Sequence, residues 1–133
     1  MKKKVKLLKF DVLNLNDRIY TKKEVEPCLI SLKEKIRDGV LFGELGYPEN
    51  YDVCLREASH KILDLYIEDD YLIGVIETLN NSNGLVLKEI IDTVVFRPSS
   101  IGTVNEDKYI KLEKILTFNA INSETDAFKG MID

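Results

Sequence analysis

Apolar and polar positions along the first part of the chain predict a strand over Val5–Leu13, which is followed by a turn. Both faces of this segment are partly apolar, so the strand is expected inside a sheet. The next segment, 14–18, is rich in Asn and Asp, whose side chains imitate backbone turns. It is therefore expected to turn the chain toward the next element.

An amphipathic helix is predicted to open at Thr21. Thr21 and Glu24 have the spacing of a capping box, in which two side chains satisfy the free amides of the first turn. Gly39 stands where helices commonly end in a left-handed residue. Pro27 predicts a local distortion or a slightly later start. The apolar residues between these signals form one stripe: Val25, Leu29, Leu32 and Ile36.

Further strands are predicted by apolar runs and by alternation of apolar and polar residues. These segments are 40–45, 58–67, 71–79, 94–97, 101–104 and 109–119. The turn at 68–70 joins two of them into a hairpin, and 105–108 joins the last two. Pro98 is expected to interrupt the strand that begins at Val94. The segment 80–84 is predicted to be a loop and helix start, and a short helix is predicted over 85–91.

This order of elements differs from regular βαβ alternation. It predicts one α+β domain over residues 1–133, with a mainly antiparallel sheet or barrel and two flanking helices. The polar tail 123–133 is expected to fray.

The charge balance argues against some classes of partner. The 133 residues include 19 basic and 23 acidic side chains, a formal net charge of −4. This balance does not favour nucleic acid, which needs a surplus of Lys and Arg on one face. No apolar run approaches the roughly 18–20 residues of a membrane span. The basic start at Met1–Lys4 is not followed by the apolar segment of a signal peptide, so none is expected.

Metal and cofactor sites are not expected. One histidine and two cysteines, Cys28 and Cys54, are too few for a zinc site, and the cysteines are expected to be reduced and structural. The acidic run Glu68-Asp69-Asp70 lacks the ligand spacing of a calcium loop and is expected to be a solvated turn.

Five short segments resemble, in order, the motifs of one family. They are Asn14-Leu15-Asn16-Asp17-Arg18-Ile19-Tyr20, Gly43-Glu44-Leu45-Gly46-Tyr47-Pro48-Glu49, Ser59-His60, Pro98-Ser99-Ser100-Ile101-Gly102-Thr103-Val104 and Leu116-Thr117-Phe118-Asn119. The family is the prohead (capsid maturation) serine proteases of tailed phages, and the resemblance covers residues 5–128. It implies the α+β sheet or barrel fold that these enzymes share with herpesvirus assemblins.

The departures from the family pattern concern its catalytic groups. The family's catalytic histidine falls at Tyr47, and the Asp before it is Gly46. A phenol is a poor general base near neutral pH. The family's segment that contains the nucleophilic serine can be aligned with this chain in two ways. Anchoring the segment on Gly102 shifts the family's serines onto Arg97 and Pro98, whereas anchoring it on the two serines puts Ile101 at the family's arginine.

If activity survives, the candidate groups are Ser99, Ser100 and His60. His60 has two interpretations: a hydrogen-bonded strand histidine at a sheet edge, which is favoured, or the base of a rescued dyad with one of the serines. Arg18 is expected to point inward and pair with Glu44.

The resemblance predicts a catalytically degenerate phage or prophage protein that keeps the scaffold for binding. The expected partner is a phage capsid or scaffold protein or a host protein, and a homo-oligomer is possible. The expected location is the host cytoplasm or the virion. The alternatives are an active serine endopeptidase that processes prohead scaffold and a virion structural subunit. The expected binding groove consists of Tyr47, Tyr51, Arg97, Ser99 and Ser100.

Overall fold

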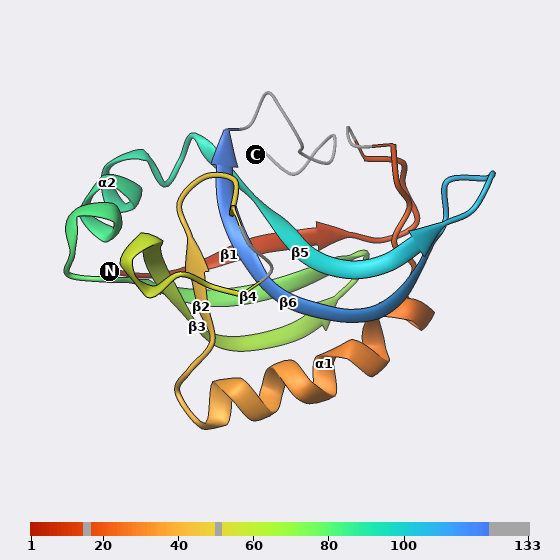
Figure 1. The fold of residues 1–133 in the computed structure, drawn as a ribbon, viewed down its shortest axis with the longest axis horizontal. Coiled ribbons are helices and arrows are strands. Elements are labelled where there is room, and N and C mark those ends of the chain that lie inside the picture. Colours follow the sequence, from red (N-terminus) through yellow and green to blue (C-terminus); the bar gives the residue numbers. More distant parts are fainter. Residues whose placement is uncertain (15–16, 50–51, 123–133) are drawn as a thin grey trace.

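The structure is a computed structural model that describes residues 1–14, 17–49 and 52–122. Its elements, in chain order, are β1 (Lys2–Lys9), α1 (Lys22–Arg37), β2 (Phe42–Glu44), a 3-10 turn (Leu55–Glu57), β3 (Ala58–Glu68), β4 (Tyr71–Thr78), α2 (Ser82–Ile90), β5 (Val94–Val104) and β6 (Ile110–Asn122). Figure 1 shows α1 along one side of the strands and α2 at one end. The predicted α+β class is confirmed. The predicted tail, 123–133, lies outside the described residues.

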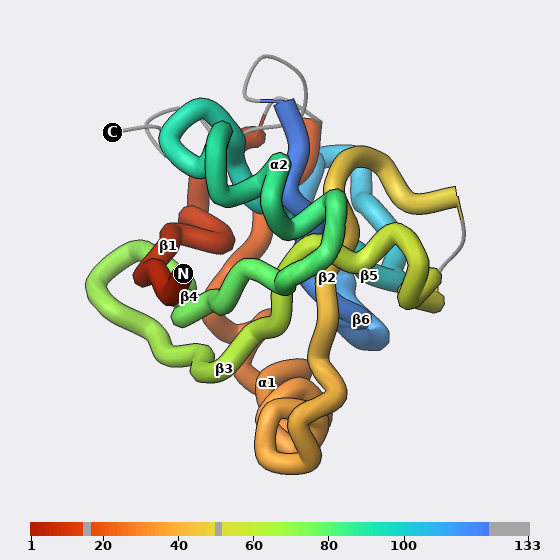
Figure 2. Tube along the Cα trace, turned by 90° about the vertical axis from the view of Figure 1, so that its left-hand side faces the viewer, coloured from red at the N-terminus to blue at the C-terminus, as the bar shows by residue number. Residues whose placement is uncertain are grey.

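The strands form an antiparallel sheet and a long hairpin that close on one another. Four strands pair in the order β1-β4-β3-β2, and β5 pairs with β6. β6 lies along the outer edge of β2 (Figure 2), where Leu45 and Ala120 form a parallel bridge. The Thr117 hydroxyl donates to the Phe42 carbonyl at 2.6 Å. Side chains of β6 therefore satisfy backbone groups at an edge that would otherwise need another strand.

α1 begins and ends where its sequence signals predict, but only the Thr21 half of the capping box forms, because Glu24 Oε1 accepts from the Leu112 amide of β6 at 2.8 Å. Thr21 is the N-cap, and its hydroxyl accepts from the Glu24 amide at 3.3 Å. Gly39 has φ +72°. The amides of Gly39 and Val40 donate to Ile36 and Lys35, which is the Schellman pattern. The helix starts at Lys22 with Pro27 inside it, so the predicted later start was wrong.

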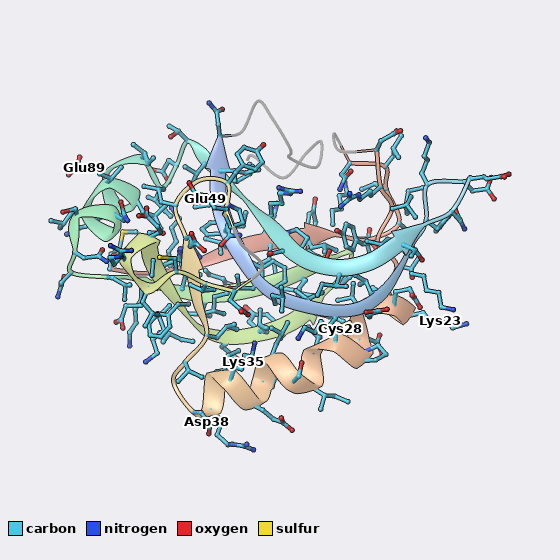
Figure 3. The ribbon with its side chains drawn as sticks, in the orientation of Figure 1. Lys23, Cys28, Lys35, Asp38, Glu49 and Glu89 are labelled. Carbon is cyan, nitrogen blue, oxygen red and sulfur yellow. The ribbon has the colours of Figure 1, made fainter. Side chains whose placement is uncertain are left out.

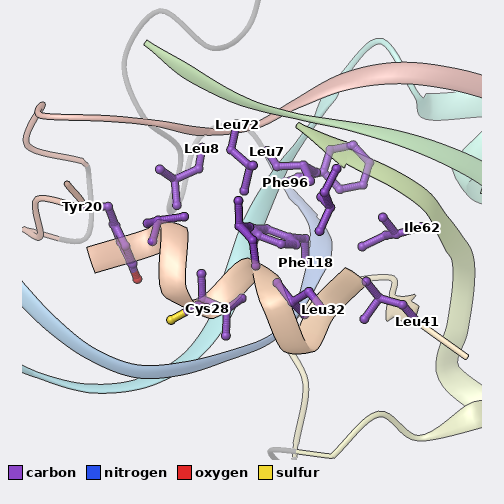
Figure 4. Packing of buried hydrophobic residues seen from close by; sticks show 14 of the residues in the cluster. Leu7, Leu8, Tyr20, Cys28, Leu32, Leu41, Ile62, Leu72, Phe96 and Phe118 are labelled. Atoms are coloured by element: carbon purple, nitrogen blue, oxygen red, sulfur yellow. The ribbon is translucent and has the colours of Figure 1, made fainter. Parts of the chain in front are cut away.

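The apolar stripe of α1 covers one large core, which includes Val25, Cys28 and Leu32. Cys28 is labelled on this helix in Figures 3 and 4. Phe118 of β6 is fully buried at the centre of the core. Both cysteines are free thiols. Within the described ranges, neither helix is long and apolar enough to cross a bilayer.

The predicted boundaries at the end of β1 and at Pro98 were wrong. β1 ends at Lys9, because Phe10 bonds to Asp70 and Asp11 turns the chain with φ +62°. β5 continues through Pro98, which pairs with Phe118. β5 is hydrogen-bonded only to β6 among the described strands, and a strand with an open edge tolerates a residue without an N–H.

The second helix starts within the segment 80–84 that was predicted to lead into it. α2 begins at Ser82, because the Asn81 side chain caps it by accepting from the Gly84 amide at 2.7 Å. Leu87 is the residue of α2 that enters the core.

Candidate functional site

A cleft of about 560 Å³ lies between the loop after β2 and the β5–β6 hairpin. Four of the five predicted groove residues line it: Tyr47, Arg97, Ser99 and Ser100. The fifth, Tyr51, lies outside the described residues. Three further lining residues, Pro48, Glu49 and Pro98, belong to the loop and the serine strand beside which the resemblance places the groove. Sequence reasoning did not assign the remaining three to the groove: Arg18, Asn119 and Ile121.

The loop after β2 supplies one wall of the cleft. Gly46 turns the chain with φ +89°, a conformation that favours glycine, and its amide donates to the Ala120 carbonyl at 2.7 Å. This bond holds the loop against β6, and Glu49 extends from the same loop (Figure 3). Tyr47 is 52% exposed, and the Arg97 guanidinium lies 5.4 Å from the centre of its ring. The two side chains therefore form a cation–π pair across the cleft.

The opposite wall contains the two serines, both of them half-buried. A β-bulge falls between them, because Ser99 pairs with Thr117 whereas Ser100 pairs with Ile115. The extra residue is Leu116 of β6, and a second shift follows between Ile101 and Gly102, so the direction of the side chains changes along this part of the hairpin. The Ser100 hydroxyl lies 3.2 Å from the buried Tyr20 hydroxyl, which ties the segment before α1 to β5.

His60 lies in the core, where it is fully buried. Its Nε2 lies 2.9 Å from the Phe118 carbonyl, and its Nδ1 lies 2.8 Å from the Ser59 hydroxyl. A carbonyl only accepts, so Nε2 carries the proton and Nδ1 accepts from Ser59. Phe96 packs edge-on against the ring at 5.3 Å between centroids. Burial lowers the pKa of His60 to about 4, so the ring is neutral near pH 7.

The rescued dyad is therefore not formed. Both nitrogens of His60 are used by Ser59 and Phe118, and neither is left to accept a proton from Ser99 or Ser100. The favoured alternative, a hydrogen-bonded strand histidine, is correct in its bonding. Its position is not a sheet edge, because His60 pairs with Gly43 of β2 on one side and Thr78 of β4 on the other.

The predicted pair between Arg18 and Glu44 was also wrong. Glu44 is 5% exposed, and its Oε2 accepts from the Cys54 amide at 3.2 Å. Arg18 is half-buried and lines the cleft. No ion pair joins the two side chains in the part of the chain that the structure describes. The carboxylate instead holds the segment that leads into β3.

Asn119 is the most buried of the lining residues that sequence reasoning missed. It is 3% exposed, and its Oδ1 accepts from the Glu44 amide at 2.9 Å. It pairs with Arg97 in the β5–β6 ladder, so both side chains lie on one face of the hairpin. Its signals in the sequence were a place at the end of the motif Leu116-Thr117-Phe118-Asn119 and a polar residue at the end of an apolar strand, and neither distinguishes a lining residue from an edge residue.

The acidic turn at Glu68-Asp69-Asp70 does not line this cleft. Glu68 pairs with Lys4 at 3.4 Å on the surface, and Asp69 turns the chain with φ +53°. Over the described ranges, the structure contains no group of three or more His, Cys, Asp or Glu side chains placed to hold a metal ion.

Comparisons with known proteins bear on the fold. No family model matches the sequence, and no curated protein does either. Among solved structures, the chain is similar to the bacteriophage T4 capsid assembly protease, gp21, with a TM-score of 0.76 and 20% sequence identity. The match covers 90% of this chain and 80% of the T4 chain. The chain therefore has the prohead-protease-like fold that its sequence motifs indicate.

Proposed function

We propose that this protein binds an extended segment of another protein in the cleft and does not cleave it. The observation that carries the proposal is the separation of the serines from the only histidine. Ser99 and Ser100 line the cleft, whereas His60 is fully buried with both ring nitrogens bonded. Serine proteolysis needs a base within hydrogen-bond reach of the hydroxyl, and this cleft contains no histidine.

The shape of the site supports binding of an extended segment. β5 passes along the cleft, and β6 is the only described strand that is hydrogen-bonded to it, so one edge of β5 has no ladder partner. Such an edge can accept a further strand through backbone hydrogen bonds, and side chains on the adjacent walls then select the sequence. Tyr47 and Arg97 are of the residue types that carry most of the energy at protein interfaces. The proposed partner is a phage capsid or scaffold protein or a host protein, met in the host cytoplasm or the virion.

Purified protein is expected to leave phage scaffold proteins and itself intact. Time courses of the wild type and of a Ser99→Ala/Ser100→Ala variant, followed by mass spectrometry, measure this. Cleavage that disappears in the double variant would establish the alternative, an active serine endopeptidase. A Gly46→Asp/Tyr47→His variant, which restores the family pattern in the loop, is a useful companion. Weak activity in that variant alone would support loss of the base as the cause.

Tyr47→Ala and Arg97→Ala are each expected to weaken partner capture by about tenfold or more, which corresponds to the 1.4 kcal/mol or more typical of truncation at an interface hot spot. Pull-downs from phage-infected cells identify the partner, and titration of that purified partner gives the affinity. Tyr109→Ala is the matched control, because Tyr109 is 45% exposed but lies outside the cleft. Equal affinity of all four proteins, with unchanged melting temperatures, would place the interface elsewhere.

A further inference from the structure

We infer that the side-chain amide of Asn119 donates a hydrogen bond to a backbone carbonyl oxygen of the segment in the cleft, an inference that rests on the proposed function. Asn119 lies on β6, in the floor of the cleft, and is 3% exposed. A polar side chain buried to this extent is normally satisfied inside the protein. In Asn119, only the oxygen of the side-chain amide has a hydrogen-bond partner among the described residues.

The oxygen of this amide is fixed by its partner. Oδ1 accepts from the backbone amide of Glu44 at 2.9 Å. Because a backbone N–H can only donate, the atom that faces it must be the oxygen and not the nitrogen. β2 and β6 are joined beside this bond by the bridge between Leu45 and Ala120. The amide is therefore held between two strands, with Nδ2 on its other arm.

Nδ2, the other arm of this amide, is the donor that remains. A primary amide nitrogen has two hydrogens to donate, and no described residue accepts either of them from Asn119. Within the described ranges, no fully buried side-chain nitrogen or oxygen lacks a hydrogen-bond partner. Nδ2 must therefore reach the solvent that fills the cleft. Because Asn119 lines the cleft, a bound segment can meet this donor.

The chemistry of this donor selects its acceptor. Nδ2 is neutral, its orientation is fixed before binding, and it lies on a strand rather than a loop. A neutral donor held in place suits a neutral acceptor such as a peptide carbonyl, and little side-chain entropy is lost when the bond forms. An extended segment along β5 presents carbonyl groups at regular intervals. Asn119 would thus fix the register of the segment against Ser99 and Ser100.

The test uses N-acetyl-tetraalanine amide, a neutral peptide with backbone polar groups only, titrated into ¹⁵N-labelled protein. The side-chain NH₂ resonances of Asn119 are expected to shift in a saturable way, together with the backbone amides of Ser99 and Ser100. Asn119→Asp keeps an oxygen for the Glu44 amide and replaces the donor with an acceptor. It is expected to weaken binding of the peptide, followed at the two serine amides, by about tenfold.

Thr117→Val is the matched control. Thr117 also holds β2 against β6, through its bond to Phe42, but does not line the cleft. It should lower the melting temperature and leave peptide affinity unchanged. Shifts at Ser99 and Ser100 without a shift at Asn119 would overturn this inference and leave the proposed cleft intact, whereas no shift at any of the three would count against both. Shifts produced by sodium acetate but not by the peptide would overturn it in favour of a carboxylate site.

Discussion

Acidification from pH 7 to pH 4 is expected to reduce the free energy of unfolding by about 3 kcal/mol through His60 alone. In the folded chain, burial lowers the pKa of His60 from 6.5 to about 4. The unfolded chain therefore takes up a proton first as the pH falls. The contribution of His60 to stability is complete above pH 6.5 and is lost as the pH falls from there to about 4.

Urea unfolding at intervals between pH 7 and pH 4 measures this effect. His60 is the only histidine, so the slope between pH 5 and 6.5 reports it with little interference from carboxyl groups. His60→Asn is the control, and its stability should be nearly constant over that interval. If the variant is too unstable, the ring resonances of His60 in the wild type serve instead, and they should not titrate above pH 5. A ring that titrates near pH 6.5 would contradict the burial of His60.

The same histidine shows where sequence analysis succeeds and where it stops. Local signals were reliable, because the cap at Thr21 and the left-handed Gly39 depend on residues within one or two turns of each other. The order of strands and hairpins followed from alternation. The sequence also limited the chain to one imidazole, so a missing base at the position of Tyr47 could be recognised without a structure.

Long-range partners could not be predicted. The Glu44 carboxylate accepts a hydrogen bond from the Cys54 amide. The Glu44 backbone amide donates to Oδ1 of Asn119, which lies 75 positions away in the sequence. The bond to Asn119 depends on the register between β2 and β6, which a single sequence does not encode in any short pattern. Pro98 failed as a strand breaker for a related reason, since its cost depends on whether a neighbour occupies that edge of β5.

Gly43→Ala is expected to cost about 3 kcal/mol or more of stability, the upper end of what one added core methyl group costs. A Cβ at Gly43 would collide with His60 Nε2 and with the backbone oxygen of Phe118, the two atoms of a buried hydrogen bond. The backbone oxygen is part of the β6 ladder, so it cannot turn aside as a flexible side chain could. To relieve this clash, β2 must move away from β6 or the hydrogen bond between His60 and Phe118 must break. Loss of a buried hydrogen bond costs about 1–3 kcal/mol more.

Thermal and urea unfolding of Gly43→Ala should be compared with Gly46→Ala, three residues along the same segment. Gly46 has no neighbouring atom within 4 Å of an added Cβ, so only its left-handed backbone opposes the change, at roughly 1–2 kcal/mol. Gly43→Ala should also speed exchange of the His60 Nε2 proton with solvent, whereas Gly46→Ala should not. Equal losses of unfolding free energy in the two variants would mean that β2 can shift at little energetic cost. The wall of the cleft that carries Tyr47 would then be movable rather than fixed by the bond between His60 and Phe118.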